Sequence, residues 1–101
     1  MIEEKWQQMT LMQQLGNLLA EISRAANLEK ANKHDDRNNS LERALELIDL
    51  TLTDSRNFER SRELGILRET IADNYVESNY YQISLNDIQN YLLPFAILSR
   101  K

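Results

Sequence analysis

The stretch from Ser40 to Leu52, SLERALELIDLTL, constrains the fold more than any other part of the chain. Its apolar residues recur at the three- and four-residue spacing of one helix face, and two further leucines widen that face beyond a single seam. The face consists of Leu41, Ala44, Leu45, Ile48 and Leu52, and the widening residues are Leu47 and Leu50. A helix this apolar needs neighbours on more than one side, so the stretch predicts the inner helix of a small bundle.

The low glycine and proline content points to helices rather than strands. The chain of 101 residues holds two glycines and one proline, far fewer than the several per cent of each in an average protein. A turn-rich β architecture needs more of both, so we expect an all-α fold. The length suits a single domain with one core. We therefore expect one helical-bundle domain over residues 1–101.

The charge balance disfavours nucleic acid as a partner. Twelve basic and sixteen acidic residues give a net charge of -4, whereas nucleic-acid-binding domains usually carry a basic excess. The absence of cysteine excludes disulfides and thiolate metal sites. No stretch approaches the roughly 20 apolar residues of a membrane span, and the amino terminus lacks the basic and apolar regions of a signal peptide. We expect a cytoplasmic protein with no membrane partner.

Four helices follow from the periodicity of the apolar residues and from the polar segments between them. They are expected over residues 11–32, 37–52, 56–77 and 85–99, after a short lead-in over residues 2–9. Capping-box spacing marks two of the starts, since Thr10 precedes Gln13 and Ser84 precedes Asp87 by three residues. Short connections between neighbouring helices predict an up-and-down four-helix bundle.

Small residues recur on two of the expected helices. Gly16 and Ala20 belong to the first helix, and Gly65 and Ala72 belong to the third. Because a glycine inside a helix costs about 1 kcal/mol relative to alanine, its presence suggests that another helix packs closely there. We expect close helix packing at these four positions, where leucine in place of either glycine would overpack the contact.

The candidate acid and metal groups are better explained as solvated surface. His34 is the only histidine and precedes Asp35 and Asp36 in a turn, but adjacent residues in a turn seldom converge on one ion. The acids that follow one face of the second helix, usually the solvated face, are Glu42, Glu46 and Asp49. We therefore expect no catalytic, metal-binding or cofactor-binding residue and no cofactor.

Three arginines form a candidate site for phosphate or for an acidic partner. Arg56, Arg60 and Arg62 gather where the third helix begins, although positive charge is unfavourable at a helix N-terminus. Glu59 and Glu63 are interleaved with them and could neutralise the group, which leaves a mixed charged surface as the alternative.

The carboxyl-terminal third offers the stronger functional lead, because aromatic residues are enriched at interface cores. The candidate interface residues are Trp6, Tyr80, Tyr81, Tyr91, Leu92, Phe95 and Leu98. Alternatively, the last helix completes the bundle and Trp6 packs over one end of it. We expect a homodimer or a contact with another helical protein.

Four segments together resemble a group of short bacterial all-helical proteins known mainly as hypothetical proteins. They are WQQMTLMQQLGNLLAEISRA, LERALELIDLTL, LRETIADNY and NYLLPFAILSR. The resemblance covers most of the chain and implies an all-α fold. It brings no activity, cofactor or catalytic residue.

A weaker analogy is to the small helical bundles called HEPN, which partner minimal nucleotidyltransferases. The chain lacks the arginine and histidine pair of HEPN ribonucleases, because Arg24 lies too far upstream of His34 and Arg37 lies on its wrong side. The preferred hypothesis is thus a non-enzymatic, self-associating interaction module. The alternative is a HEPN-like partner of a nucleotidyltransferase, or a component that binds nucleic acid or phosphate in a two-protein system.

Overall fold

The computed structural model describes residues 2–98, and these residues fold into helices without a β-strand. The elements are the α-helices α1 (Ile2–Gln7), α2 (Leu11–Lys30), α3 (His34–Thr53), α4 (Ser61–Val76) and α5 (Leu85–Leu98), and the 3-10 helix η1 (Ser55–Arg60). The expected all-α class is confirmed. No described helix combines the length and the apolar character needed to cross a bilayer.

Both capping boxes expected from the sequence are present. The backbone N–H of Gln13 donates to Thr10 Oγ1 at 3.2 Å, and the backbone N–H of Thr10 donates back to Gln13 Oε1 at 2.9 Å. Ser84 and Asp87 exchange the same pair of bonds at 3.0 and 3.1 Å. Each box satisfies two of the backbone donors that a helix start leaves free, which explains why α2 and α5 begin where they do.

Other helix ends differ from the sequence expectation. The first long helix ends at Lys30 rather than at residue 32, because Asn32 turns into the left-handed region at a φ of 58°. The next helix already begins at His34. The helix expected over residues 56–77 is divided into η1 and α4, since the Asp54 side chain caps Arg56 N and starts a 3-10 turn. The last helix was expected to reach residue 99, which lies outside the described residues.

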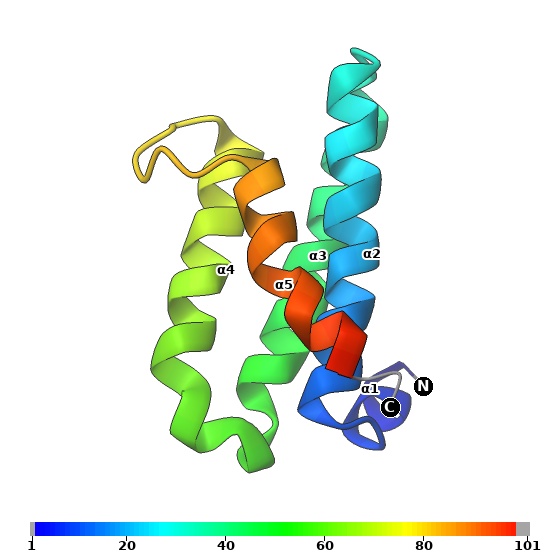
Figure 1. Cartoon of the computed structure of the whole chain (residues 1–101), viewed down its shortest axis with the longest axis vertical. Helices are drawn as coiled ribbons and strands as arrows, with labels where there is room; N and C mark the ends of the chain where they lie inside the picture. Colours follow the sequence, from blue (N-terminus) through cyan, green and yellow to red (C-terminus); the bar gives the residue numbers. More distant parts are fainter. Residues whose placement is uncertain (1, 99–101) are drawn as a thin grey trace.

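Among the four longer helices, α4 and α5 are neighbours that pack only loosely against each other. Helix α3 returns alongside α2, α4 packs against α3, and α5 crosses in front and packs against α2 (Figure 1). Few contacts join α4 to α5, although these two helices follow one another in the chain. The segment between them, residues 77–84, forms a wide loop at one end of the molecule (Figure 1).

The stretch SLERALELIDLTL lies at the centre of the core, as its apolar face predicts. Leu41, Ala44 and Ile48 are completely buried in α3, and Leu45, Leu47 and Leu52 pack against the core from its edge. The acids Glu42 and Glu46 are exposed on the opposite face. Burial of three aliphatic side chains of this kind contributes several kcal/mol, at about 1.5–3 kcal/mol for each large one.

A buried polar network joins the start of the chain to the end of α3. Gln14 is fully buried, and its side-chain N–H groups donate to Trp6 O at 2.9 Å and to Asp54 Oδ2 at 3.1 Å. The amide of Asn57 donates to Gln14 Oε1 at 3.0 Å, and the indole N–H of Trp6 donates to Thr51 Oγ1 at 2.9 Å. Because every bond is formed inside the protein, this network fixes α1 and η1 against α2 and α3.

The small residues do not mark close helix packing throughout. A Cβ placed on Gly65 would meet no neighbouring atom within 4 Å, and Ala20 is exposed. Gly16 and Ala72 are half-buried. The expectation of a close crossing is therefore wrong at Gly65, where α4 faces open space rather than another helix.

We predict that Gly65→Ala stabilises the protein by about 0.5–1 kcal/mol, because alanine restricts the unfolded chain and the helix has room for the added methyl group. Thermal unfolding followed by circular dichroism measures the effect. Replacing the exposed Ala20 with glycine is the matched control and should destabilise the protein by a similar amount. A loss of stability in Gly65→Ala would mean that the space around residue 65 is occupied.

Candidate functional site

A groove of about 480 Å³ lies between α4 and α5. It exists because α5 packs on α2 and leaves the side of α4 uncovered. The residues that line it come from η1, α4, the loop before α5, and α5 itself: Glu59, Arg60, Arg62, Glu63, Ile66, Leu67, Thr70, Ile83, Asp87, Ile88 and Tyr91. The groove thus brings together two regions that are distant in the sequence, the start of the third expected helix and the last helix.

The middle of the groove is apolar. Leu67 and Ile88 are buried and form its floor, while Ile66 and Tyr91 are about half exposed at its walls. Ile83 contributes from the loop before α5 and packs against the core cluster. Pockets that bind small molecules have this character, with an apolar lining and a few polar groups at the edge.

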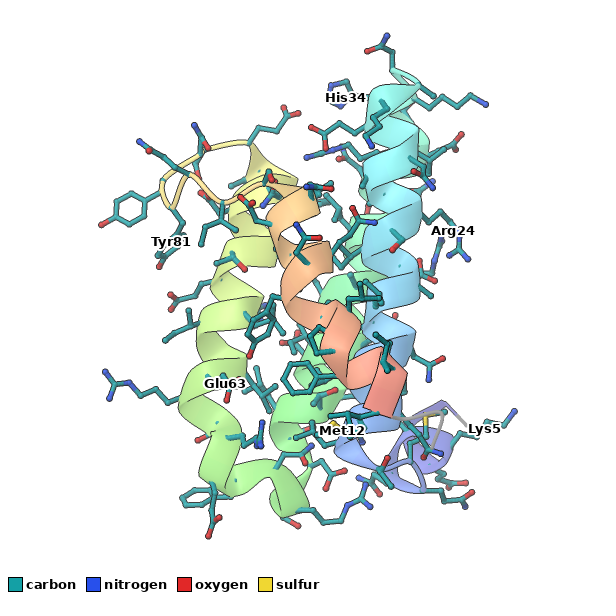
Figure 2. The ribbon with its side chains drawn as sticks, viewed as in Figure 1. Lys5, Met12, Arg24, His34, Glu63 and Tyr81 are labelled. Atoms are coloured by element: carbon teal, nitrogen blue, oxygen red, sulfur yellow. The ribbon has the colours of Figure 1, made fainter. Side chains whose placement is uncertain are left out.

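A hydrogen bond from Tyr91 to Glu63 spans the groove from α5 to α4. The phenol O–H donates to Glu63 Oε1, and Glu63 lies on the stretch of α4 beside α5 (Figure 2). Partial burial, the bond to Glu63 and the negative charge of Glu63 together raise the pKa of Tyr91 to about 12. Tyr91 is therefore a neutral hydrogen-bond donor at physiological pH, and its ring also contacts Phe95 at a centroid distance of 5.6 Å.

At the end of the groove near η1, positive and negative side chains lie close together. Arg60 Nη1 lies 3.8 Å from Glu63 Oε2, and Glu59 and Arg62 bring one further charge of each sign. Asp87, at the other end, accepts the backbone N–H of Ser84 and belongs to the cap of α5. The groove edge is a mixed charged surface rather than a cationic patch, as the alternative to the arginine site predicted.

The three candidate arginines are not equivalent in the structure. Arg56 is held by Asp54, with Nη2 at 2.6 Å from Oδ2 and Nε at 3.0 Å from Oδ1, and it also donates to Met9 O at 2.8 Å. Arg60 and Arg62 line the groove instead. Arg56 thus helps to fix the α3–η1 junction, where its Nε and Nη2 atoms are both engaged.

The Asp54 and Arg56 pair predicts a dependence of stability on acid pH. The bonds from Arg56 hold the pKa of Asp54 well below its ordinary value of 3.8. Since the unfolded chain then binds the proton more readily, the free energy of unfolding should fall as the pH decreases below about 4. Urea unfolding between about pH 2 and pH 5 measures this slope, which should be shallower in Asp54→Asn. The exposed Glu42→Gln should keep the wild-type slope, and equal slopes in all three proteins would contradict the prediction.

The other candidate chemical groups are spread over the surface. His34 lies near the start of α3 at the opposite end of the molecule from Glu63, with Nε2 at 3.6 Å from Glu77 Oε1 (Figure 2). Arg24 and Arg43 both pair with Glu21, at 2.7 and 3.2 Å. In the part of the chain that the structure describes, no three histidine, cysteine, aspartate or glutamate residues are grouped so that they could hold a metal ion.

The candidate interface residues separate into buried and exposed members. Trp6 is only 3% exposed and Leu92 is fully buried, so both belong to the core and not to an open surface. This agrees with the alternative that Trp6 packs over one end of the molecule. Tyr80, Tyr81, Tyr91 and Leu98 are exposed, and Phe95 is half-buried.

Two interface candidates were missed from the sequence. Leu93 and Ile97, four residues apart on α5, are 49% and 51% exposed, and Leu98 beside them is 51% exposed. The signal was available, because no charged residue occurs from Ile88 to Leu98. Only the packing of α5 on α2, however, decides which of these apolar side chains remain outside.

Arg37 was also missed, because it was considered only for the HEPN motif and was assigned no place in the fold. It is 3% exposed, its Nη2 donates to Asn74 O at 2.8 Å, and its Nε lies 3.7 Å from Glu29 Oε2. The guanidinium thereby ties α3 to the carboxyl end of α4. Its surroundings are those of a structural residue that holds two helices together.

Comparisons with known proteins place no further constraint on this site. No protein-family model matches the chain, and neither a curated protein nor a solved structure is significantly similar to it. The resemblance to short bacterial helical proteins therefore stays a prediction.

Proposed function

We propose that this protein is a non-enzymatic interaction module, an up-and-down four-helix bundle that forms a homodimer through the outer face of α5. The observation that supports the proposal is the exposure of Leu93, Ile97 and Leu98 on one uncharged stretch of that helix. Adjacent apolar side chains that remain half exposed on a small monomer are typical of an interaction surface.

A second copy of the chain is the partner that suits this face. In a two-fold symmetric contact, each group near the axis faces its own copy, so any charge there would meet a like charge. The stretch from Ile88 to Leu98 contains no charge, while the chain as a whole carries a net charge of -4. Two copies can therefore meet along α5 without repulsion between like charges at the axis.

The contents of the groove support a binding role rather than an enzymatic one. Its lining includes no histidine, cysteine or serine, and two of its carboxylates, Glu63 and Asp87, already accept hydrogen bonds from Tyr91 and from the backbone of Ser84. A chain without cysteine needs no oxidising compartment, so a cytoplasmic location is part of the proposal.

Light scattering over a micromolar to millimolar concentration range tests the proposal. We expect the wild-type chain to dimerise, and the double variant Leu93→Glu with Ile97→Glu to raise the dissociation constant at least about a hundredfold, because it brings charges into an apolar contact. Val76→Glu is the matched control, since Val76 is an aliphatic residue 65% exposed on α4, and it should dimerise like the wild type. A wild-type chain that stays monomeric throughout would overturn the proposal.

A further inference from the structure

The α4–α5 groove is large enough for a small molecule and is apolar where such a molecule would lie. Its volume of about 480 Å³ falls within the usual range for ligand pockets. Along α4 it extends from Arg62 to Thr70, which corresponds to roughly 12 Å at the helical rise per residue. Water on the floor formed by Leu67 and Ile88 finds few hydrogen-bond partners, so displacing it with an apolar group is favourable.

The polar groups of the groove indicate that its ligand is uncharged. Glu63 faces Arg60 and accepts the Tyr91 hydroxyl, and Asp87 is occupied in the cap of α5. The remaining charges, Glu59 and Arg62, are of opposite sign. The charges that line the groove are therefore of mixed sign and do not favour an anion or a cation, and a charged ligand would lose its hydration over the apolar floor, which makes its binding unfavourable.

Two hydroxyl groups indicate where the ligand carries a hydrogen-bond donor. The hydrogen of Tyr91 is donated to Glu63, and the hydrogen of Thr70 is donated to Leu67 O at 2.7 Å. A hydroxyl has one hydrogen and two lone pairs, so each oxygen can still accept a hydrogen bond, and both residues line the groove. A ligand with an O–H or N–H group can bond to either oxygen, whereas a ligand with acceptors alone cannot.

We propose that the groove between α4 and α5 binds an uncharged, mainly apolar small molecule that carries one hydrogen-bond donor, as a phenol or an indole does. The apolar floor holds the body of the ligand, and the hydroxyl oxygens of Tyr91 and Thr70 receive its donor. This inference is independent of self-association, since the face of α5 proposed for the dimer contains Leu93 and Ile97, which are not part of the groove lining.

Titration with compounds that share one ring system tests the inference. The probes are a naphthol, the methoxynaphthalene that lacks the donor, a naphthoate anion and a naphthylmethylammonium cation, each followed by the methyl NMR signals of Ile66, Ile83 and Ile88. We expect saturable binding of the naphthol at least about tenfold tighter than that of either ion, and weaker binding of the methoxy compound. Equal affinity for all four probes, or no saturable binding of the naphthol, would overturn the proposal.

Matched variants locate the site and separate this proposal from the dimer. Ile66→Asp should weaken naphthol binding about tenfold or more by placing a charge on the groove wall, while Val76→Asp, also on α4 but outside the lining, should leave it unchanged. If the wild type is monomeric and still binds the naphthol, this inference stands and the dimer proposal fails. If Ile66→Asp dissociates a dimer, the groove is occupied by a second copy and the inference is overturned.

Discussion

Trp6→Ala is expected to destabilise the protein by about 3–5 kcal/mol, because it removes a large buried side chain and leaves a cavity. Trp6 is 3% exposed, and its indole N–H donates to Thr51 Oγ1 at 2.9 Å. The whole stability of a small domain is commonly only about 5–15 kcal/mol. This one substitution at the end of the short helix α1 should therefore remove a large part of the total.

Urea unfolding followed by circular dichroism measures the loss, and Trp6→Phe is the control. Phenylalanine keeps most of the apolar volume and gives up the bond to Thr51, whose hydroxyl still donates to Leu47 O at 2.9 Å. We expect Trp6→Phe to cost about 1–2 kcal/mol. If Trp6→Ala cost less than about 1 kcal/mol, α1 would not be packed as the structure shows. Trp6 would then again be a candidate for an interface.

Gln14→Glu is expected to cost about 3 kcal/mol at neutral pH, although the two side chains have almost the same shape. Gln14 Nε2 lies 3.1 Å from Asp54 Oδ2 in a buried position. The substitution replaces a hydrogen-bond donor with a second carboxylate, and two buried like charges at this distance repel strongly. The size of this loss of stability shows how strongly the buried polar network depends on the neutral amide of Gln14.

The stability of the Gln14→Glu variant relative to the wild type should depend on pH in a defined direction. Repulsion by Asp54 raises the folded-state pKa of the introduced carboxyl above its unfolded value of about 4.3. The variant is therefore penalised as the pH rises above about 4.3, and its deficit relative to the wild type should shrink as the pH falls toward 4. Gln8→Glu makes the same change at an exposed position, and its effect should stay within about 0.5 kcal/mol. A similar loss of stability in Gln14→Glu and in Gln8→Glu would show that residue 14 is not buried beside Asp54.

Much of the local structure was predictable, because local patterns determine it. The Thr10 and Ser84 caps depend on residues three positions apart, and the burial of Leu41, Ala44 and Ile48 follows from helical periodicity alone. The division of the third helix at η1 was not predictable in this way. The Asp54 cap starts the 3-10 turn, but the turn is held in place by Asn57, which donates both to Thr51 O and to Gln14 Oε1, on a residue 43 positions away.

Only part of the candidate site could be predicted from the sequence, because the rest depends on contacts between residues that are distant in the chain. The arginines of the third helix and the aromatic residues of the last helix were identified, but their relation depends on how two helices pack. Arg56 turns toward Asp54, and Arg60 and Arg62 lie along the groove with Tyr91. The buried position of Arg37 was missed, because its main partner is the carbonyl of Asn74 on another helix.

By itself, the sequence determined that the chain is helical, where two of its helices begin, and which face of SLERALELIDLTL is buried. These properties arise from backbone propensity, capping and periodicity within a few turns of one helix. The tertiary structure decided that α5 packs on α2 and leaves a groove beside α4, and that Trp6 lies inside while Leu93 and Ile97 lie outside. The physical reason is that apolar burial is non-directional, so an apolar helix can pack against any suitable neighbour. The partner is set by the packing of all the helices together.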